Sequence, residues 1–183
     1  MSRTEQPQYT VIESSGKIET RQYAPMTVAE TQVAGGRKDA IQQGFRTIAA
    51  YIFGGNADAR KIAMTAPVIQ QAPGNPGAEA EQPLDRTLWK VRFVMPQAFA
   101  LDALPVPRDP AVKLAPLAAR RYVAIRFSGS TSDDNLRRHH AILRDHVLER
   151  GLNVTGEPAL AFYDPPWTLP FLRRNEIWLE LAE

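Results

Sequence analysis

The chain has 183 residues, of which 44% are hydrophobic, and this composition suits one globular domain or two closely fused halves. Its 22 basic and 20 acidic residues nearly balance, and the densest basic clusters are only the pairs Arg137-Arg138 and Arg173-Arg174, so no basic stripe indicates a nucleic-acid-binding surface. The absence of cysteine excludes disulfides, zinc–thiolate sites, iron–sulfur clusters and thiolate ligation of a heme.

The N-terminus and the longest apolar runs bear on the compartment. Residues 1–7 are polar and lack the apolar core of a signal peptide. No run approaches the roughly 18 apolar residues that a membrane-spanning helix needs. We therefore expect a cytoplasmic protein without a membrane span, and a monomer.

The first half of the chain predicts three strands, a helix and two further strands. The helix is expected over about 38–53, because Ile41, Phe45, Ile48 and Ile52 recur with helical spacing. Gly54-Gly55 follows at the position of a C-terminal cap. The expected strands are 9–12, 17–23, 26–33, 62–70 and 88–95, with a loop over 71–86 that is rich in Pro, Gly, Ala and Glu.

The second half repeats this order after a proline-rich linker over 96–110. Its helix begins at Ser132-Asp133-Asp134, which offers an N-cap and an acidic first turn, and ends near Arg150. An apolar stripe of Leu136, Leu143 and Val147 runs along it. The expected strands are 112–114, 121–127, 159–163 and 176–181.

The sequence thus predicts an α+β fold in which a β-α-β-β unit occurs twice, over about 9–95 and 111–182. Two such units can form a distorted, antiparallel, barrel-like sheet flanked by two helices, since each helix must bury its stripe against a sheet. A concave apolar surface is expected where a helix meets the sheet or where the halves meet. Such junctions favour small-molecule binding.

No pattern in the chain indicates catalysis. There is no nucleophile elbow and no P-loop, and Gly35-Gly36 and Gly54-Gly55 lack the spacing of a dinucleotide-binding loop. The three histidines, His139, His140 and His146, fall on the second helix without the i, i+4 spacing of a helical metal site.

Three segments, in this order, carry a family resemblance. They are Phe45-x-x-Ile48-x-x-Tyr51-Ile52-x-Gly54-x-Asn56 with Ile62-x-Met64-Thr65-x-Pro67-Val68, then Trp89-x-Val91-x-Phe93-x-Met95-Pro96, and last Tyr163-Asp164-Pro165-Pro166 with Arg173-Arg174-Asn175-Glu176-Ile177-Trp178. Together they resemble the SOUL family of heme-binding proteins over nearly the whole chain. The resemblance implies a duplicated β-α-β-β fold related to effector-binding domains of bacterial transcription regulators. It also implies non-covalent, non-enzymatic binding of heme (b-type) or another porphyrin.

The resemblance further implies a shallow apolar groove, with the first helix as one wall and the loop before Met64 and the C-terminal loop completing it. Apolar side chains suit the flat ring, a glycine permits close approach to the helix backbone, and basic side chains suit the propionates. The expected contact residues are Ile41, Gly44, Phe45, Ile48, Ile52, Arg60, Lys61, Met64, Leu169, Phe171, Arg173 and Arg174.

Several alternatives stay open at this stage. The iron ligand is either Met64, His140 or no side chain, since a methionine sulfur and a histidine nitrogen both ligate heme iron. The first functional hypothesis is a heme buffer or carrier, and the second is a binding module for other amphipathic small molecules. The third is a hydrolytic or heme-modifying enzyme that uses Glu157, Glu176 or Tyr163. Arg173 and Arg174 have a simpler role available, as ion-pair partners of Glu176 or Glu180. An exposed apolar groove is also suited to a protein partner.

Overall fold

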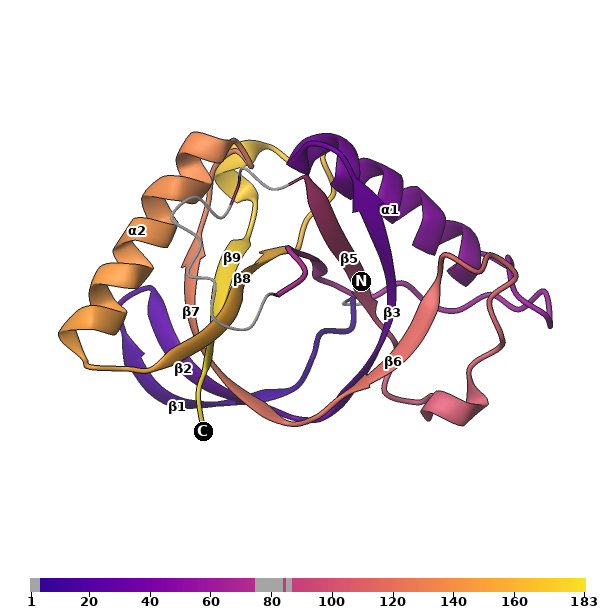
Figure 1. Cartoon of the computed structure of the whole chain (residues 1–183), viewed down its shortest axis with the longest axis horizontal. Helices are drawn as coiled ribbons and strands as arrows, with labels where there is room; N and C mark the ends of the chain where they lie inside the picture. Colours follow the sequence, from indigo (N-terminus) through magenta and orange to yellow (C-terminus); the bar gives the residue numbers. More distant parts are fainter. Residues whose placement is uncertain (1–3, 75–83, 85–86) are drawn as a thin grey trace.

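The computed structural model describes residues 4–74, 84 and 87–183, and within them two helices lie against one antiparallel sheet of nine strands (Figure 1). This confirms the predicted α+β class. The elements are β1 (Tyr9–Ser15), β2 (Ile18–Tyr23), β3 (Met26–Ala34), α1 (Arg37–Ile52), β4 (Val68–Gln71), β5 (Leu88–Val94), β6 (Lys113–Leu117), β7 (Arg120–Phe127), α2 (Asp133–Glu149), β8 (Val154–Phe162) and β9 (Asn175–Leu181), with short 3-10 helices at Leu101–Ala103 and Pro170–Leu172.

The strand order is β1-β2-β7-β9-β8-β4-β5-β3-β6, so the described sheet is open, with β1 and β6 at its edges. Two four-stranded blocks, β2-β7-β9-β8 and β4-β5-β3-β6, meet between β8 and β4. In each block one strand comes from the other half of the chain: β2 pairs with β7, and β6 pairs with β3. This exchange is the arrangement that a duplicated unit with interlocked halves would give.

The predicted strand over 62–70 is wrong in its first part, because the ladder contains only Val68–Gln71. The residues before it bond elsewhere. The Thr65 hydroxyl donates to the carbonyl of Val94 at 2.6 Å, and the Ala66 amide donates to the carbonyl of Glu5 at 2.9 Å. Pro67 has no amide hydrogen to offer a ladder. The loop expected over 71–86 falls mostly on residues outside the described part.

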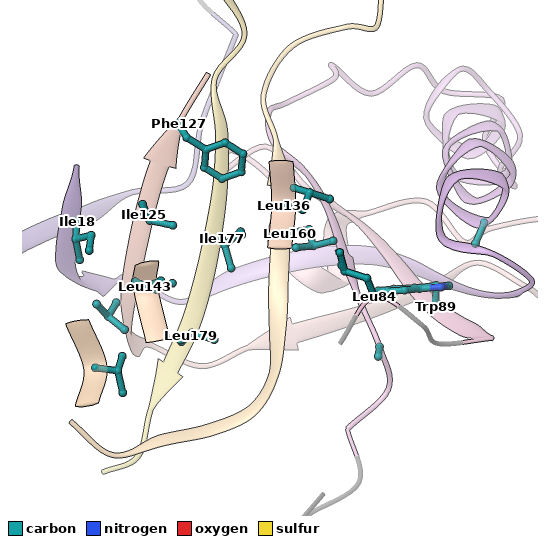
Figure 2. Packing of buried hydrophobic residues seen from close by; sticks show 14 of the residues in the cluster. Ile18, Leu84, Trp89, Ile125, Phe127, Leu136, Leu143, Leu160, Ile177 and Leu179 are labelled. Carbon is teal, nitrogen blue, oxygen red and sulfur yellow. The ribbon is translucent and has the colours of Figure 1, made fainter. Parts of the chain in front are cut away.

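Both helices lie on the same face of the sheet. Cross-strand partners share a face, and the register joins Val91 of β5 through Gln70, Leu160 and Ile177 to Ile125 of β7, so all of these residues lie on one face. Helix α1 packs on β3 and β5, and α2 packs on β7 and β9. Figure 2 shows the second contact, where Leu136 and Leu143 of α2 face Ile125, Ile177 and Leu160.

The two helices begin as the sequence indicates. Ser132 caps α2, because its hydroxyl accepts a hydrogen bond from the Asn135 amide at 3.3 Å. Helix α1 has no side-chain cap, but its first residue, Arg37, donates to Asp133 at 2.8 Å and to the carbonyl of Thr131 at 2.6 Å. The N-termini of the two helices are thereby held together.

Gly44 sets the distance between α1 and the sheet. A Cβ atom placed there would lie 2.5 Å from Cγ2 and 2.7 Å from Cβ of Val91. Real Cβ atoms do not approach that closely, so the helix backbone rests directly on β5. Gly44 thus serves helix–sheet packing in this structure.

We expect Gly44→Ala to lower the free energy of unfolding by about 1–3 kcal/mol, because overpacking outweighs the roughly 1 kcal/mol that alanine adds to a helix. Urea denaturation measures the change. In a Val91→Ala background the same substitution should cost at least about 1 kcal/mol less, since the clashing methyl groups are gone. Equal costs in both backgrounds would show that Val91 is not the limiting contact.

Candidate functional site

The stripe of α1 that the sequence proposes as a porphyrin wall divides into a buried and an exposed part. Ile48 and Ile52 are fully buried against the sheet, as Gly44 is against Val91. Ile41 is half-buried, and Phe45 is 37% exposed with its ring 5.3 Å from that of Phe93. Only Ile41 and Phe45, at the edge of the helix, are accessible for a ligand.

The segment after α1 folds back onto the end of the helix. Asn56, which is fully buried, organises it: its side-chain amide donates to the carbonyls of Tyr51 at 3.0 Å and Arg60 at 2.8 Å, and its oxygen accepts from the Arg60 amide at 3.0 Å. Phe53 and Lys61 then form an antiparallel bridge, and the Ile62 amide donates to the carbonyl of Ile52. The conformation of this loop is therefore fixed by its own hydrogen bonds.

This loop displays apolar and basic side chains together. Phe53 is 60% exposed and Met64 is 37% exposed, and Arg60 and Lys61 lie between them in sequence and are exposed. The guanidinium of Arg60 lies over the ring of Phe99, 4.7 Å from its centroid, which is a cation–π contact. The structure thus places Arg60, Lys61 and Met64 on the loop that directly follows α1.

The C-terminal loop between β8 and β9 has a defined internal structure. The Arg173 guanidinium donates to the carbonyls of Thr168 at 2.8 Å and Pro166 at 2.7 Å, so Arg173 braces the loop. The Gly129 amide ties the loop to the segment between β7 and α2 by donating to the carbonyl of Pro170. The exposed apolar residues of the loop are Trp167, Leu169, Phe171 and Leu172.

The face between the two helices has a half-buried floor near this loop. Val68 of β4 lies opposite Phe93 of β5 and opposite Phe162 of β8, so the three share the helix-bearing face. Neither α1 nor α2 packs chiefly on β4 or β8. Val68 and Phe162 stay half-buried, between the edge of α1 that carries Phe45 and the start of the C-terminal loop.

The histidines lie elsewhere. His139 stacks on Phe127, with ring centroids 4.0 Å apart, and its Nδ1 lies 2.8 Å from the Asn135 carbonyl. His140 is packed under α2, where burial and then the charge of Arg144 lower the pKa of its imidazole. The cavity beside it measures about 10 Å³, which is far too small for a porphyrin. Among the described residues no group of three or more His, Asp or Glu is arranged to hold a metal ion.

The other face of the sheet, which carries no helix and is called here the helix-free face, contains a buried charge cluster. Glu176 of β9 is 0% exposed. Arg21 of β2 binds it through two hydrogen bonds of 2.7 and 3.0 Å, and Arg174 donates two more at 2.8 and 3.1 Å. The Trp178 indole at 2.7 Å and the Tyr163 hydroxyl at 3.0 Å complete the donors to this carboxylate.

These contacts decide the protonation states in the cluster. Burial alone would raise the pKa of Glu176, but the hydrogen bonds and charge of Arg21, followed by the charge of Arg174, lower it below its ordinary value. Burial alone would lower the pKa of Arg21, and its bonds to Glu176 raise it instead. The pKa of Tyr163 is raised, first by burial and then by the charge of Glu176. Glu176 is thus an anion held by two cations at neutral pH.

The cluster answers two questions left open by the sequence. Arg174 forms an ion pair with Glu176, which is the simpler of the two roles that the sequence allows for it. Arg173 instead donates its hydrogen bonds to loop carbonyls. Two residues of the enzymatic alternative, Glu176 and Tyr163, are hydrogen-bonded to each other within the cluster. Glu157 lies in the bulge of β8 between Thr155 and Ala159, whereas Glu176 lies opposite Ala161. The ladder therefore does not pair the two carboxylates.

A groove of about 620 Å³ opens beside this cluster and was not anticipated from the sequence. The N-terminal segment 4–8 forms one side of it, held by hydrogen bonds from Ala24 to Gln8 and from Ala66 to Glu5. Gln6 lines the groove and also accepts a hydrogen bond from Arg174 at 3.2 Å. Apolar side chains from β3, β5, β6 and their ends line the remainder, among them Met26, Val94, Met95, Phe99 and Leu117.

The chain belongs to the SOUL family, because the family model described as "SOUL heme-binding protein" matches residues 4–180. A curated relative, Heme-binding protein 1 of Xenopus laevis, is 26% identical over 163 residues, which cover 88% of this chain and 82% of the relative. No helix in the described residues is long and apolar enough to cross a membrane.

Solved structures with this fold come from proteins of different kinds. The C-terminal domain of EcmrR superposes with a TM-score of 0.68 at 12% identity, over 96% of this chain and 98% of that domain. A hydrolase from Listeria innocua gives a TM-score of 0.60 at 15% identity, over 91% of this chain and 92% of that one. Identities this low establish a shared fold and nothing about activity.

Replacing Glu176 by Gln should lower the free energy of unfolding by about 3–5 kcal/mol near neutral pH, because two guanidinium groups lose a buried anion. The folded-state pKa of Glu176 lies below its ordinary value of 4.5. Its stabilising contribution is therefore complete above that value and is lost as the pH falls through the folded-state pKa. Urea denaturation of both proteins at about pH 7 and about pH 3 should show a smaller difference in acid.

Glu180→Gln is the matched control for this substitution. Glu180 pairs with the more exposed Arg120 at 3.0 Å, and such a pair contributes about 1 kcal/mol or less. Equal losses for Glu176→Gln and Glu180→Gln would contradict the assignment of Glu176 as the buried anchor.

Proposed function

We propose that this chain binds heme or a related porphyrin reversibly and without covalent attachment, at the edge of α1, and serves as a heme buffer or carrier. Membership of a heme-binding family supports the ligand class. The observation that supports the location is the exposure of Phe45 on α1 and of Phe53 and Met64 on the loop that also carries the exposed cations Arg60 and Lys61. The proposal assigns no catalytic turnover to the chain.

The chemistry of these residues fits a porphyrin. Its flat face needs apolar partners, and Phe45 and Phe53 present aromatic rings while Met64 supplies an adaptable, polarizable side chain. Its propionates need cations, and Arg60 and Lys61 are exposed on the same loop. Arg173 and Arg174 are less suited to this task than the sequence implied, because their guanidinium groups already bind protein oxygen atoms.

The iron, when the bound porphyrin carries it, supplies the redox and ligand chemistry, and the chain supplies the contacts that retain the ring. Met64 is the side chain in this region that is suited to bind iron, through its thioether. His140 faces the core under α2 and lies outside the proposed surface. One thioether ligand or none is consistent with ready release, which a carrier requires.

The groove on the helix-free face supports a second candidate, the binding of another amphipathic small molecule. Its volume of about 620 Å³ lies within the roughly 300–1,000 Å³ of small-molecule sites. Among the described residues that line it there is one carboxylate, Glu5, and no lysine or arginine. A dicarboxylate such as a porphyrin would find no cation there, so the groove suits an uncharged or cationic molecule better.

Phe45→Asp is expected to weaken hemin binding by about 10- to 100-fold, because a carboxylate would replace an aromatic contact and repel the propionates. His140→Ala should leave the affinity within about threefold of wild type. Titration of each purified protein with hemin, followed by the Soret band and by quenching of tryptophan fluorescence, measures both affinities.

Unchanged hemin affinity in both Phe45→Asp and His140→Ala would place the ligand away from α1. Leu117→Asp, in the groove on the helix-free face, provides the comparison in that case. Loss of hemin binding in Leu117→Asp together with full binding in Phe45→Asp would overturn the proposed location. Thermal denaturation of all three variants identifies any that fail to fold.

Met64→Leu tests iron ligation separately from ring binding. Leucine preserves most of the apolar volume but has no sulfur, so the affinity for hemin should change by less than about tenfold. The absorption spectrum of the ferrous complex should shift if the thioether ligates the iron. An unchanged spectrum would exclude Met64 as a ligand, and metal-free protoporphyrin, which needs no ligand, serves as the control.

A further inference from the structure

The helix-free face contains the parts of a site for an organic cation. Four aromatic rings lie in contact there: the Tyr23 centroid is 5.0 Å from that of Tyr9, 4.9 Å from that of Trp178 and 5.5 Å from that of Tyr122. Glu176, fully buried, lies next to this ring cluster through its hydrogen bond to Trp178. Aromatic faces around a desolvated carboxylate form the arrangement by which proteins recognise organic cations.

A cation already occupies this arrangement, and the chain itself provides it. The guanidinium of Arg21 lies 4.4 Å from the centroid of Tyr9 and makes the bidentate contact with Glu176. It also donates to the Tyr23 hydroxyl at 3.0 Å and to Glu19 at 2.8 Å. Arg21 is 2% exposed, and each of its three guanidinium nitrogen atoms donates a hydrogen bond inside the protein.

The charges of the cluster balance only when Arg21 is present. Two guanidinium groups, Arg21 and Arg174, lie between two carboxylates, Glu19 and Glu176. Without Arg21 the cluster would carry one cation against two anions. Glu176 would keep its bonds to Arg174, Trp178 and Tyr163 but lose the two from Arg21. A space with the shape of a guanidinium group would remain beside a negative charge.

The groove on the helix-free face lies next to the charge cluster. Gln6 lines the groove and bonds to Arg174, which in turn bonds to Glu176. A molecule in the groove is thus separated from the charge cluster by Gln6 and its neighbours in the segment 4–8. That segment is held by a few hydrogen bonds, including the one from the Ala66 amide to Glu5.

We propose that the helix-free face is a binding site for planar organic cations, of the amidinium or guanidinium class, that Arg21 keeps closed by occupying it. Arg21 is the residue that determines specificity here. It excludes free cations from the wild-type protein, and its removal opens a site with Glu176 as the counter-ion and the tyrosine and tryptophan rings as walls. This inference does not depend on the binding of a porphyrin at α1.

The test uses Arg21→Ala with benzamidinium chloride as the probe and neutral benzamide as its uncharged counterpart. Arg21→Ala should melt at a lower temperature than wild type and should be stabilised by benzamidinium in a saturable manner. The expected rise in Tm is about 5–11 °C at a hundredfold excess over Kd. Benzamide should have no such effect, and wild type and Arg120→Ala, which removes a more exposed arginine, should not respond to either compound.

A second variant links the effect to the proposed counter-ion. Adding Glu176→Gln to Arg21→Ala removes the anion, and stabilisation by benzamidinium should disappear. If Arg21→Ala does not fold alone, refolding with benzamidinium should restore its native circular dichroism spectrum and refolding with benzamide should not. The proposal is overturned if benzamidinium has no effect on Arg21→Ala, if benzamide acts equally well, or if the effect persists in the double variant.

Discussion

The buried carboxylate of Glu176 is the interaction on which the helix-free face depends. Its donors come from β2, from the C-terminal loop, from the residue after β8 and from its own strand, β9. An anion without solvent is tolerable only when its oxygen atoms are fully bonded, so these four segments must meet at one point. The N-terminal segment is attached to this cluster as well, because Gln6 accepts a hydrogen bond from Arg174.

The two faces of the sheet therefore have separate roles. The helix-bearing face provides apolar packing, with Gly44 bringing α1 onto β5 and Leu136 and Leu143 bringing α2 onto β7 and β9. The edge of α1 and the loop after it stay accessible, and they carry Phe45 and the basic pair Arg60 and Lys61. The helix-free face satisfies its charges internally. We therefore expect a ligand with acidic groups to bind at the edge of α1 rather than on the helix-free face.

The sequence predicted those features that depend on neighbouring residues. Helical spacing located α1 and α2 to within a residue or two, and Ser132 was correctly identified as a cap. The strand expected over 62–70 failed because the partners of Thr65 and Ala66, Val94 and Glu5, are distant in sequence. The same limit applies to the site: apolar periodicity placed Ile48 and Phe45 on one stripe, but only packing decides which of them is exposed. Arg21 and Glu176 are separated by 155 positions and lie on different strands, so no local pattern in the sequence could predict their contact.

The exchange of strands between the halves has a consequence for biosynthesis. When the ribosome has completed residues up to the end of β5, β2 still lacks its partner β7, and Arg21 still lacks its bidentate partner Glu176, which lies in β9. The N-terminal half then presents an unpaired strand edge, and Arg21 has Glu19 as a partner but not the buried carboxylate of β9, so neither feature favours early burial. Completion of the sheet therefore waits for β9 to be synthesised, and the nascent protein is exposed to wrong strand pairing until then.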